Sequence, residues 1–213
     1  MLRFPLGLAL LVSTAPFAVA AAPSGSAAGG LDTSLPFQRT VINRYSLDDL
    51  PRSLSIRQGH DVWFGYDLER GALRKVWQAP AGKPGVITTH FVTRSAGTVW
   101  FEDASTETWQ LQRQGKIVPL KLRYQGCAQR ETHFELTWEL QHDAGTLTLR
   151  ERIPRAGATT TAGRAVRELR VEHLAAGEAL LPPSPARTAW QLSTDGVAVT
   201  ALTGTAWHHF TLR

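Results

Sequence analysis

Cysteine is almost absent from this chain, because Cys127 is the only one in 213 residues. A single thiol cannot form an internal disulfide, so the fold must draw its stability from an apolar core. It also cannot attach a c-type haem, which needs a Cys-x-x-Cys-His run. We expect no cofactor, and we interpret Cys127 as a half-buried thiol in a turn; a catalytic or intermolecular role is the alternative.

Other runs and motifs are missing as well. The formal net charge is +5, but Lys and Arg are scattered and never form a run of four, which argues against a nucleic-acid groove because such grooves need clustered charge. No apolar run reaches the about 20 residues that a membrane span requires. The sequence contains no Gly-x-Ser-x-Gly elbow, no His-Glu-x-x-His helix and no phosphate-binding loop. These absences leave no well-marked catalytic class.

The N-terminus has the pattern of a secretory signal. Arg3 supplies the positive charge, Leu6 to Val12 form a short apolar stretch, and Ala18-Val19-Ala20 is a small-x-small cleavage site. We therefore expect residues 1–20 to be a signal peptide that is removed on export, with no membrane span remaining. Residues 21–36 are small and rich in Gly, Ser and Ala, which is typical of a flexible linker. The expected location is periplasmic or secreted.

From residue 37 onward, apolar and polar residues alternate at period two, with Gly, Pro and Asp about every eight to twelve residues. We expect residues 37–213 to form a single all-β domain, an antiparallel β-sandwich of about ten short strands without crossover helices. Ser46 as N-cap and Asp49 at the capping-box position predict one helical turn before Pro51.

The clearest strand pair lies in residues 132–153, where apolar and polar side chains alternate on both segments. A four-residue loop at 141–144 would set Trp138 and Leu136 opposite Leu147 and Leu149, and Glu135 and His133 opposite Arg150 and Arg152. A slip of one residue would set apolar side chains against Thr and Arg, so the pattern specifies the register.

His133, Glu135 and Glu139 share the polar face of this predicted strand and are candidate ligand-binding residues. Imidazole and carboxylate groups can ligate Zn or Mn. A solvent-exposed ladder of ion pairs with Arg150 and Arg152 is the favoured explanation, so we assign no metal site and no catalytic residue. An exposed pair of this kind contributes about 0–1 kcal/mol.

The chain has seven tryptophans, and six of them, including Trp207, lie on apolar alternation that indicates core positions. Trp63 alternates oppositely to Val62, Phe64 and Tyr66, which predicts an outward-facing ring. Exposed indole rings on β-sandwiches offer a flat apolar face on which a sugar can stack. Trp63 is therefore the fourth candidate binding residue.

Two segments show a resemblance to a known family. Residues 50–77, with Tyr66-Asp67-x-x-x-Gly71-x-Leu73-x-x-x-Trp77, and residues 122–138, with Thr132-His-Phe-Glu-Leu, resemble strand pairs in a β-rich domain of large secreted c-type cytochromes of environmental bacteria. This chain lacks their haem-attachment motif, so electron transfer is not implied. The resemblance implies a non-catalytic sandwich module that docks a redox protein or a sugar-processing partner.

Two functions of different class follow. The first is an exported, non-catalytic binding or accessory module that serves a redox partner or an envelope glycan. The alternative is a carbohydrate-active enzyme or a sugar-binding domain of sandwich type. An enzyme would need a concave face with at least two convergent carboxylate or His groups, whereas a binding module would leave its polar residues in ion pairs.

Overall fold

The computed structural model describes residues 42–44, 46–59, 61–89, 92–155 and 165–213. The expected signal peptide and linker, residues 1–36, lie outside these described residues. Of the described residues, 61% lie in strands and 4% in helix, which confirms the all-β expectation. Among them, no helix has the length and apolar character needed to cross a membrane.

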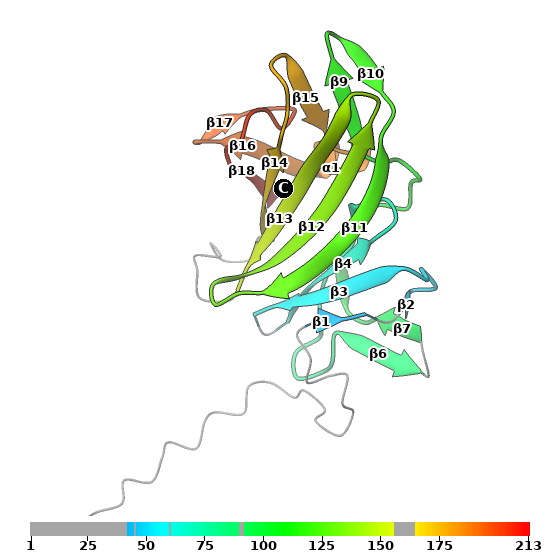
Figure 1. Cartoon of the computed structure of the whole chain (residues 1–213). Coiled ribbons are helices and arrows are strands. Elements are labelled where there is room, and N and C mark those ends of the chain that lie inside the picture. The colour runs from blue at the N-terminus through cyan, green and yellow to red at the C-terminus, as the bar shows by residue number, and fades with distance from the viewer. Residues whose placement is uncertain (1–41, 45, 60, 90–91, 156–164) are drawn as a thin grey trace, which may run out of the picture.

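The largest layer is a seven-stranded antiparallel sheet with the order β11-β12-β13-β14-β18-β16-β17 (Figure 1). Its strands are β11 (Lys121–Gln129), β12 (His133–His142), β13 (Gly145–Pro154), β14 (Val166–Glu172), β16 (Trp190–Thr194), β17 (Val197–Ala198) and β18 (His208–Leu212). Along β12, Phe134, Leu136, Trp138 and Leu140 are buried on one face. The sheet therefore has an apolar inner face and a polar outer face, as period-two alternation predicts.

The β12–β13 hairpin has a tighter turn than the sequence predicted. His142 pairs with Gly145, so Asp143 and Ala144 alone form the turn, and the expected four-residue loop is wrong. Trp138 consequently faces Leu149, and the register differs by two residues from the expected one. The backbone N–H of Ala144 donates to Nδ1 of His142 at 3.3 Å, which stabilises the short turn. Because a shift of two keeps each side chain on its face, the apolar row is unchanged.

A five-stranded antiparallel sheet packs against the inner face of the large sheet. Its order is β1-β3-β4-β5-β8, and its strands are β1 (Ile42–Asn43), β3 (Ser53–Gln58), β4 (Val62–Asp67), β5 (Ala72–Gln78) and β8 (Thr98–Glu102). Leu54, Phe64 and Val76 from this sheet join Trp138 and Leu149 of the large sheet in one buried cluster. This cluster is the main core of the sandwich.

A third, smaller layer covers the other face of the five-stranded sheet. It contains β2 (Ser46–Leu47), β6 (Val86–Thr89) and β7 (Val92–Ser95), and β2 runs parallel to β7. Figure 1 shows these strands on the side of β3 that faces away from β11–β13. Leu47 and Val86 of this layer enclose Trp63, Trp77 and Ala79 in a second buried cluster. The chain is thus a sandwich with an additional layer.

The expected helical turn at residues 46–51 is wrong, since Ser46 and Leu47 form strand β2 and a turn follows. Asp48 and Asp49 have φ angles of 47° and 69°, outside the helical region. The Asp48 carboxylate accepts the backbone N–H of Ser95 at 2.8 Å and pairs with Lys75 at 3.0 Å. These tertiary contacts hold the segment against β7 and outweigh the local capping signal.

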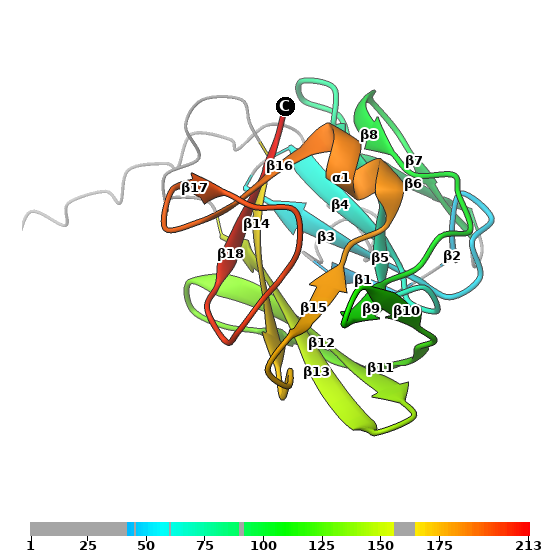
Figure 2. The ribbon, with the colours of Figure 1, turned by 90° about the horizontal axis from the view of Figure 1, so that it is seen from above.

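One end of the sandwich is closed by a small sheet and a short helix. The sheet has the order β10-β9-β15, from β9 (Gln110–Arg113), β10 (Lys116–Val118) and β15 (Glu178–Leu181). The helix α1 (Ser184–Ala189) follows β15 and leads directly into β16 (Figure 2). Leu111, Leu180 and Ala186 extend the main core into this end.

Candidate functional site

The structure places three of the predicted site residues, all on β12, on the outer face of the large sheet. His133, Glu135 and Glu139 alternate with the buried apolar residues of the strand. Glu135 and Glu139 are separated by about 13 Å at ~3.3 Å per residue. Nε2 of His133 lies 3.7 Å from Oε2 of Glu135, whereas Glu139 stands apart from both, so the three side chains form a row and not a cluster. Among the described residues, no three His, Cys, Asp or Glu side chains are placed to hold a metal ion.

Glu135 is held most tightly, with 8% of its surface exposed. Oε1 accepts from Nη1 of Arg150 and Oε2 from Nε of Arg152, each at 3.2 Å. Burial alone would raise the pKa of Glu135, but the hydrogen bond from Arg152 and the charge of Arg150 lower it. Glu135 therefore forms ion pairs with Arg150 and Arg152. The predicted cross-strand partners are wrong, however, because Glu135 lies opposite Arg152 and His133 lies opposite Pro154.

The polar network continues on both sides of Glu135. Glu139 accepts hydrogen bonds from the side-chain amides of Gln125 at 3.1 Å and Gln141 at 2.7 Å. Glu172 of β14 accepts from Nε of Arg150 at 3.1 Å and from Nη2 of Arg170 at 2.5 Å. The carboxylates of this face are therefore hydrogen-bonded acceptors, and the lowered pKa of Glu135 is unlike the raised pKa of a general acid.

Trp207 belongs to this face, and the core position that the sequence pattern predicted for it is wrong. It precedes β18, in which His208, Phe210 and Leu212 are buried, so it points to the opposite, outer side. Its partly exposed ring lies 3.9 Å from Cζ of Arg152 and 4.8 Å from Cζ of Arg170, measured to the ring centroid. The spacing held the signal that the core prediction overlooked, because positions 207 and 210 differ by an odd number and so lie on opposite sides of a strand.

Trp63 lies elsewhere, and its predicted outward orientation is wrong. The ring is 1% exposed and stacks on Trp77, with ring centroids 5.9 Å apart and an interplanar angle of 12°. A Cβ on Gly85 would lie 2.1 Å from Nε1 of Trp63, so only glycine fits at the start of the covering layer. The alternation was read correctly, but the face it points to is covered by β2, β6 and β7.

A shallow cleft lies beside the β11 edge of the outer face. β11 is bulged between Tyr124 and Gly126, and this bulge leaves a cleft of about 300 Å³. Its lining includes Arg130, Glu135, Thr137 and Arg150. The cleft thus continues the polar row of the sheet up to its edge strand, and any ligand in it would meet guanidinium groups.

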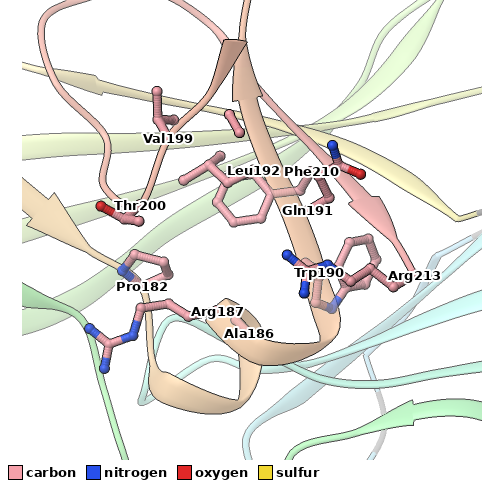
Figure 3. Close-up of a pocket in the computed structure, with 11 residues that line it drawn as sticks. Pro182, Ala186, Arg187, Trp190, Gln191, Leu192, Val199, Thr200, Phe210 and Arg213 are labelled. Atoms are coloured by element: carbon pink, nitrogen blue, oxygen red, sulfur yellow. The ribbon is translucent and has the colours of Figure 1, made fainter. Parts of the chain in front are cut away.

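A second, more enclosed pocket of about 280 Å³ lies between α1 and strands β16–β18 (Figure 3). Trp190, Leu192 and Phe210 provide apolar walls, and Arg187 and Arg213 are the charged residues of the lining. No acidic side chain of the described residues lines it. The pocket therefore combines an apolar interior with positive charge, and no residue that lines it can act as a carboxylate base.

On the core side, the walls of this pocket pack against a buried triad that consists of the Arg167–Glu151 ion pair and the hydroxyl group of Tyr66. Arg167 and Glu151, 2% and 1% exposed, form an ion pair at 3.1 Å, and the hydroxyl of Tyr66 donates to the same Glu151 oxygen at 2.5 Å. Cζ of Arg167 lies 4.8 Å from the ring centroids of both Trp190 and Phe210. The guanidinium thus fixes both rings through cation–π contacts.

A third cleft, of about 470 Å³, lies at the turn of the β12–β13 hairpin and is lined by His142, His173 and Glu178, among others. Burial alone would raise the pKa of Glu178, but the N–H of Ala175 and the Arg113 pair lower it. Nε of Arg113 donates to Glu178 at 2.7 Å, and its Nη2 lies 3.0 Å from Nδ1 of His142. Within the described part of the chain, Glu178 is therefore the single carboxylate of this cleft, and it is already paired.

Cys127 is half-buried, as expected, but lies in strand β11 and not in a turn. Burial raises the pKa of its thiol to about 11. The reactive form of cysteine is the thiolate, so Cys127 is protonated at neutral pH and poorly suited to nucleophilic chemistry.

Comparison of the chain with family models, curated proteins and solved structures gives no match. Its function is therefore inferred from these surfaces. Of the candidate surfaces, the outer face of the seven-stranded sheet joins a partly exposed aromatic ring to an ordered array of charged side chains.

Proposed function

We propose that this chain is a non-catalytic binding module of an exported glycan-processing system, and that the glycan lies along the outer face of the seven-stranded sheet. The observation that carries the proposal is Trp207, a partly exposed ring that reaches Arg170 of β14 and Arg152 of β13. A flat indole packs well on the apolar face of a sugar, and neighbouring guanidinium and carboxylate groups can hydrogen-bond its hydroxyls.

The ion pairs of this face support binding in place of catalysis. Glu135 and Glu172 each accept from two guanidinium groups, which fixes their positions before any ligand arrives. A preorganised surface loses less side-chain entropy on binding. The same pairing lowers the pKa of Glu135, so this carboxyl group is poorly suited to donate a proton to a leaving group. A glycan is preferred to a redox protein because the ring stands beside a row of guanidinium and carboxylate groups that can hydrogen-bond sugar hydroxyls.

The alternative, a carbohydrate-active enzyme, has the third cleft in its favour, because His142, His173 and Glu178 all line it. Glycoside hydrolysis generally uses two carboxyl groups on either side of the scissile bond. Among the residues that the structure describes, Glu178 is the only carboxylate that lines the cleft, and it forms an ion pair with Arg113. The binding module is therefore the better-supported function.

The test is binding of soluble glycans by calorimetry, with peptidoglycan fragments and neutral glucan oligosaccharides as probes. We expect Trp207→Ala to weaken binding by about 30-fold, since loss of an aromatic anchor costs about 2 kcal/mol or more. Trp100→Ala is the matched control, because Trp100 is also partly exposed but lies in β8 of the other sheet. Binding that is absent in the parent chain, or equally reduced in both variants, would contradict the proposal.

A further inference from the structure

The pocket between α1 and strands β16–β18 does not belong to the outer face, and the proposed glycan site does not use it. We propose that this pocket binds a small amphipathic carboxylate, with an unbranched apolar chain among Trp190, Leu192 and Phe210 and the carboxylate at Arg213. The inference stands on different residues from the proposed function, so either can fail without the other.

The apolar part of the ligand follows from the walls. Trp190 and Phe210 are each 1% exposed and Leu192 is 7% exposed, yet all three line the pocket. Figure 3 shows that the three apolar walls arise from β16 and β18, whereas α1 and the segments beside these elements supply the rest of the lining. A volume of about 280 Å³ accommodates about nine non-hydrogen atoms at roughly 30 Å³ each, the share of one water in the liquid. An eight-carbon chain has the appropriate size.

The walls are rigid, which favours a preformed site. Arg167 contacts both aromatic rings from the core side at 4.8 Å, and Phe101 packs edge-on against Trp190 with centroids 5.8 Å apart. Glu151 and Tyr66 hold Arg167 in turn. The rings therefore cannot easily collapse into the space, and an apolar ligand would meet a pocket that is already open.

The charge of the ligand follows from the rim. Arg187 and Arg213 are the charged residues of the lining, and both are positive. Arg187 donates to Oγ of Ser184 at 2.6 Å and lies near Glu107, so its charge is partly balanced. Within the described part of the chain, Arg213 forms no ion pair with an Asp or Glu side chain. A guanidinium binds a carboxylate in a bidentate manner, so Arg213 is the anchor for the head group.

The test is titration of the full chain with sodium octanoate, followed by calorimetry and by NMR of the tryptophan indole groups. Octylammonium and 1-octanol, which share the chain but not the negative charge, serve as comparison ligands. We expect octanoate to bind saturably with one site per chain and to bind more tightly than both. Arg213→Gln should weaken octanoate binding about tenfold, because a hydrogen bond to a charged group is lost, and should leave 1-octanol unchanged.

Two matched variants locate the site. Ala198 lines the pocket and is exposed, whereas its neighbour Val197 is exposed but does not line it. Ala198→Trp should abolish octanoate binding, and Val197→Trp should leave it within about twofold, a difference of less than one hydrogen bond. No octanoate binding, equal binding of octanoate and octylammonium, or equal losses in both tryptophan variants would overturn the proposal.

Discussion

Replacing Glu151 by Gln would remove the only carboxylate that faces Arg167 in the described core. Arg167 is 2% exposed and pairs with Glu151 at 3.1 Å, so its charge would remain buried without a counter-charge. Breaking a buried pair from one side costs about 3–5 kcal/mol. For a domain of this size, about 2–4 °C per kcal/mol corresponds to a fall in Tm of roughly 6–20 °C.

The other members of the triad give a graded comparison. Tyr66→Phe removes one donor to Glu151 but leaves the ion pair, and should cost about 1.5–3 kcal/mol, the contribution of a hydrogen bond to a charged group. A triple variant, Tyr66→Phe, Glu151→Leu and Arg167→Met, removes both charges together. It should come within about 2 kcal/mol of the parent, because apolar replacement of a buried pair is often neutral.

Urea unfolding at pH 7 measures this order directly, as the free energy of unfolding of each variant. Glu151→Gln within 1 kcal/mol of the parent, or a triple variant less stable than Glu151→Gln, would refute the account. Alkaline unfolding gives an independent check. Burial and the charge of Glu151 raise the pKa of Tyr66 well above its usual value. Its contribution is therefore complete below about pH 10, the unfolded value, and is lost as the pH rises further.

Three further predictions concern other parts of the fold. Gly97→Ala should cost about 2–4 kcal/mol in urea unfolding, because φ is 135° and a Cβ would lie 1.9 Å from the carbonyl oxygen of Gln78. Gly82→Ala, which has open space around it, should cost about 1 kcal/mol, and equal costs for the two variants would contradict this prediction. Burial lowers the pKa of His208, so the free energy of unfolding should be constant above about pH 6.5 and fall as the pH drops toward the folded-state pKa. His208→Gln should lose this dependence on pH, and an unchanged fall at acidic pH would exclude His208 as its cause. Glu135→Gln should cost about 1–3 kcal/mol, above the 0–1 kcal/mol of an exposed pair, and a smaller loss in urea unfolding would show that solvent screens the network.

The sequence pattern predicted the faces of the strands better than it predicted their partners. Alternation placed Glu135 and Trp138 on opposite faces of β12, and the structure agrees. It missed the hairpin register by two residues, because a shift of two preserves that alternation and only the turn decides between the registers. The candidate residues of β12 were therefore placed on the correct surface, although their cross-strand neighbours were not.

The two tryptophans show where this kind of reasoning ends. Trp63 and Trp207 both alternate against buried neighbours, but Trp63 is covered by β2, β6 and β7, whereas Trp207 lies partly exposed beside Arg152. A period-two pattern states which side of a strand a residue occupies. It does not state whether another layer packs there, because that layer is made of residues far away in the chain.

By itself, the sequence determined the all-β class, the two-sided character of the long strands and the dependence of stability on an apolar core. Those properties follow from local alternation and from a single cysteine. The tertiary structure decided which face is covered, where Arg167 finds Glu151, and how α1 and β16–β18 enclose a pocket. The physical reason is that each of these depends on contacts between strands that no local pattern specifies, and the free energy of burying or pairing a side chain is set by those contacts.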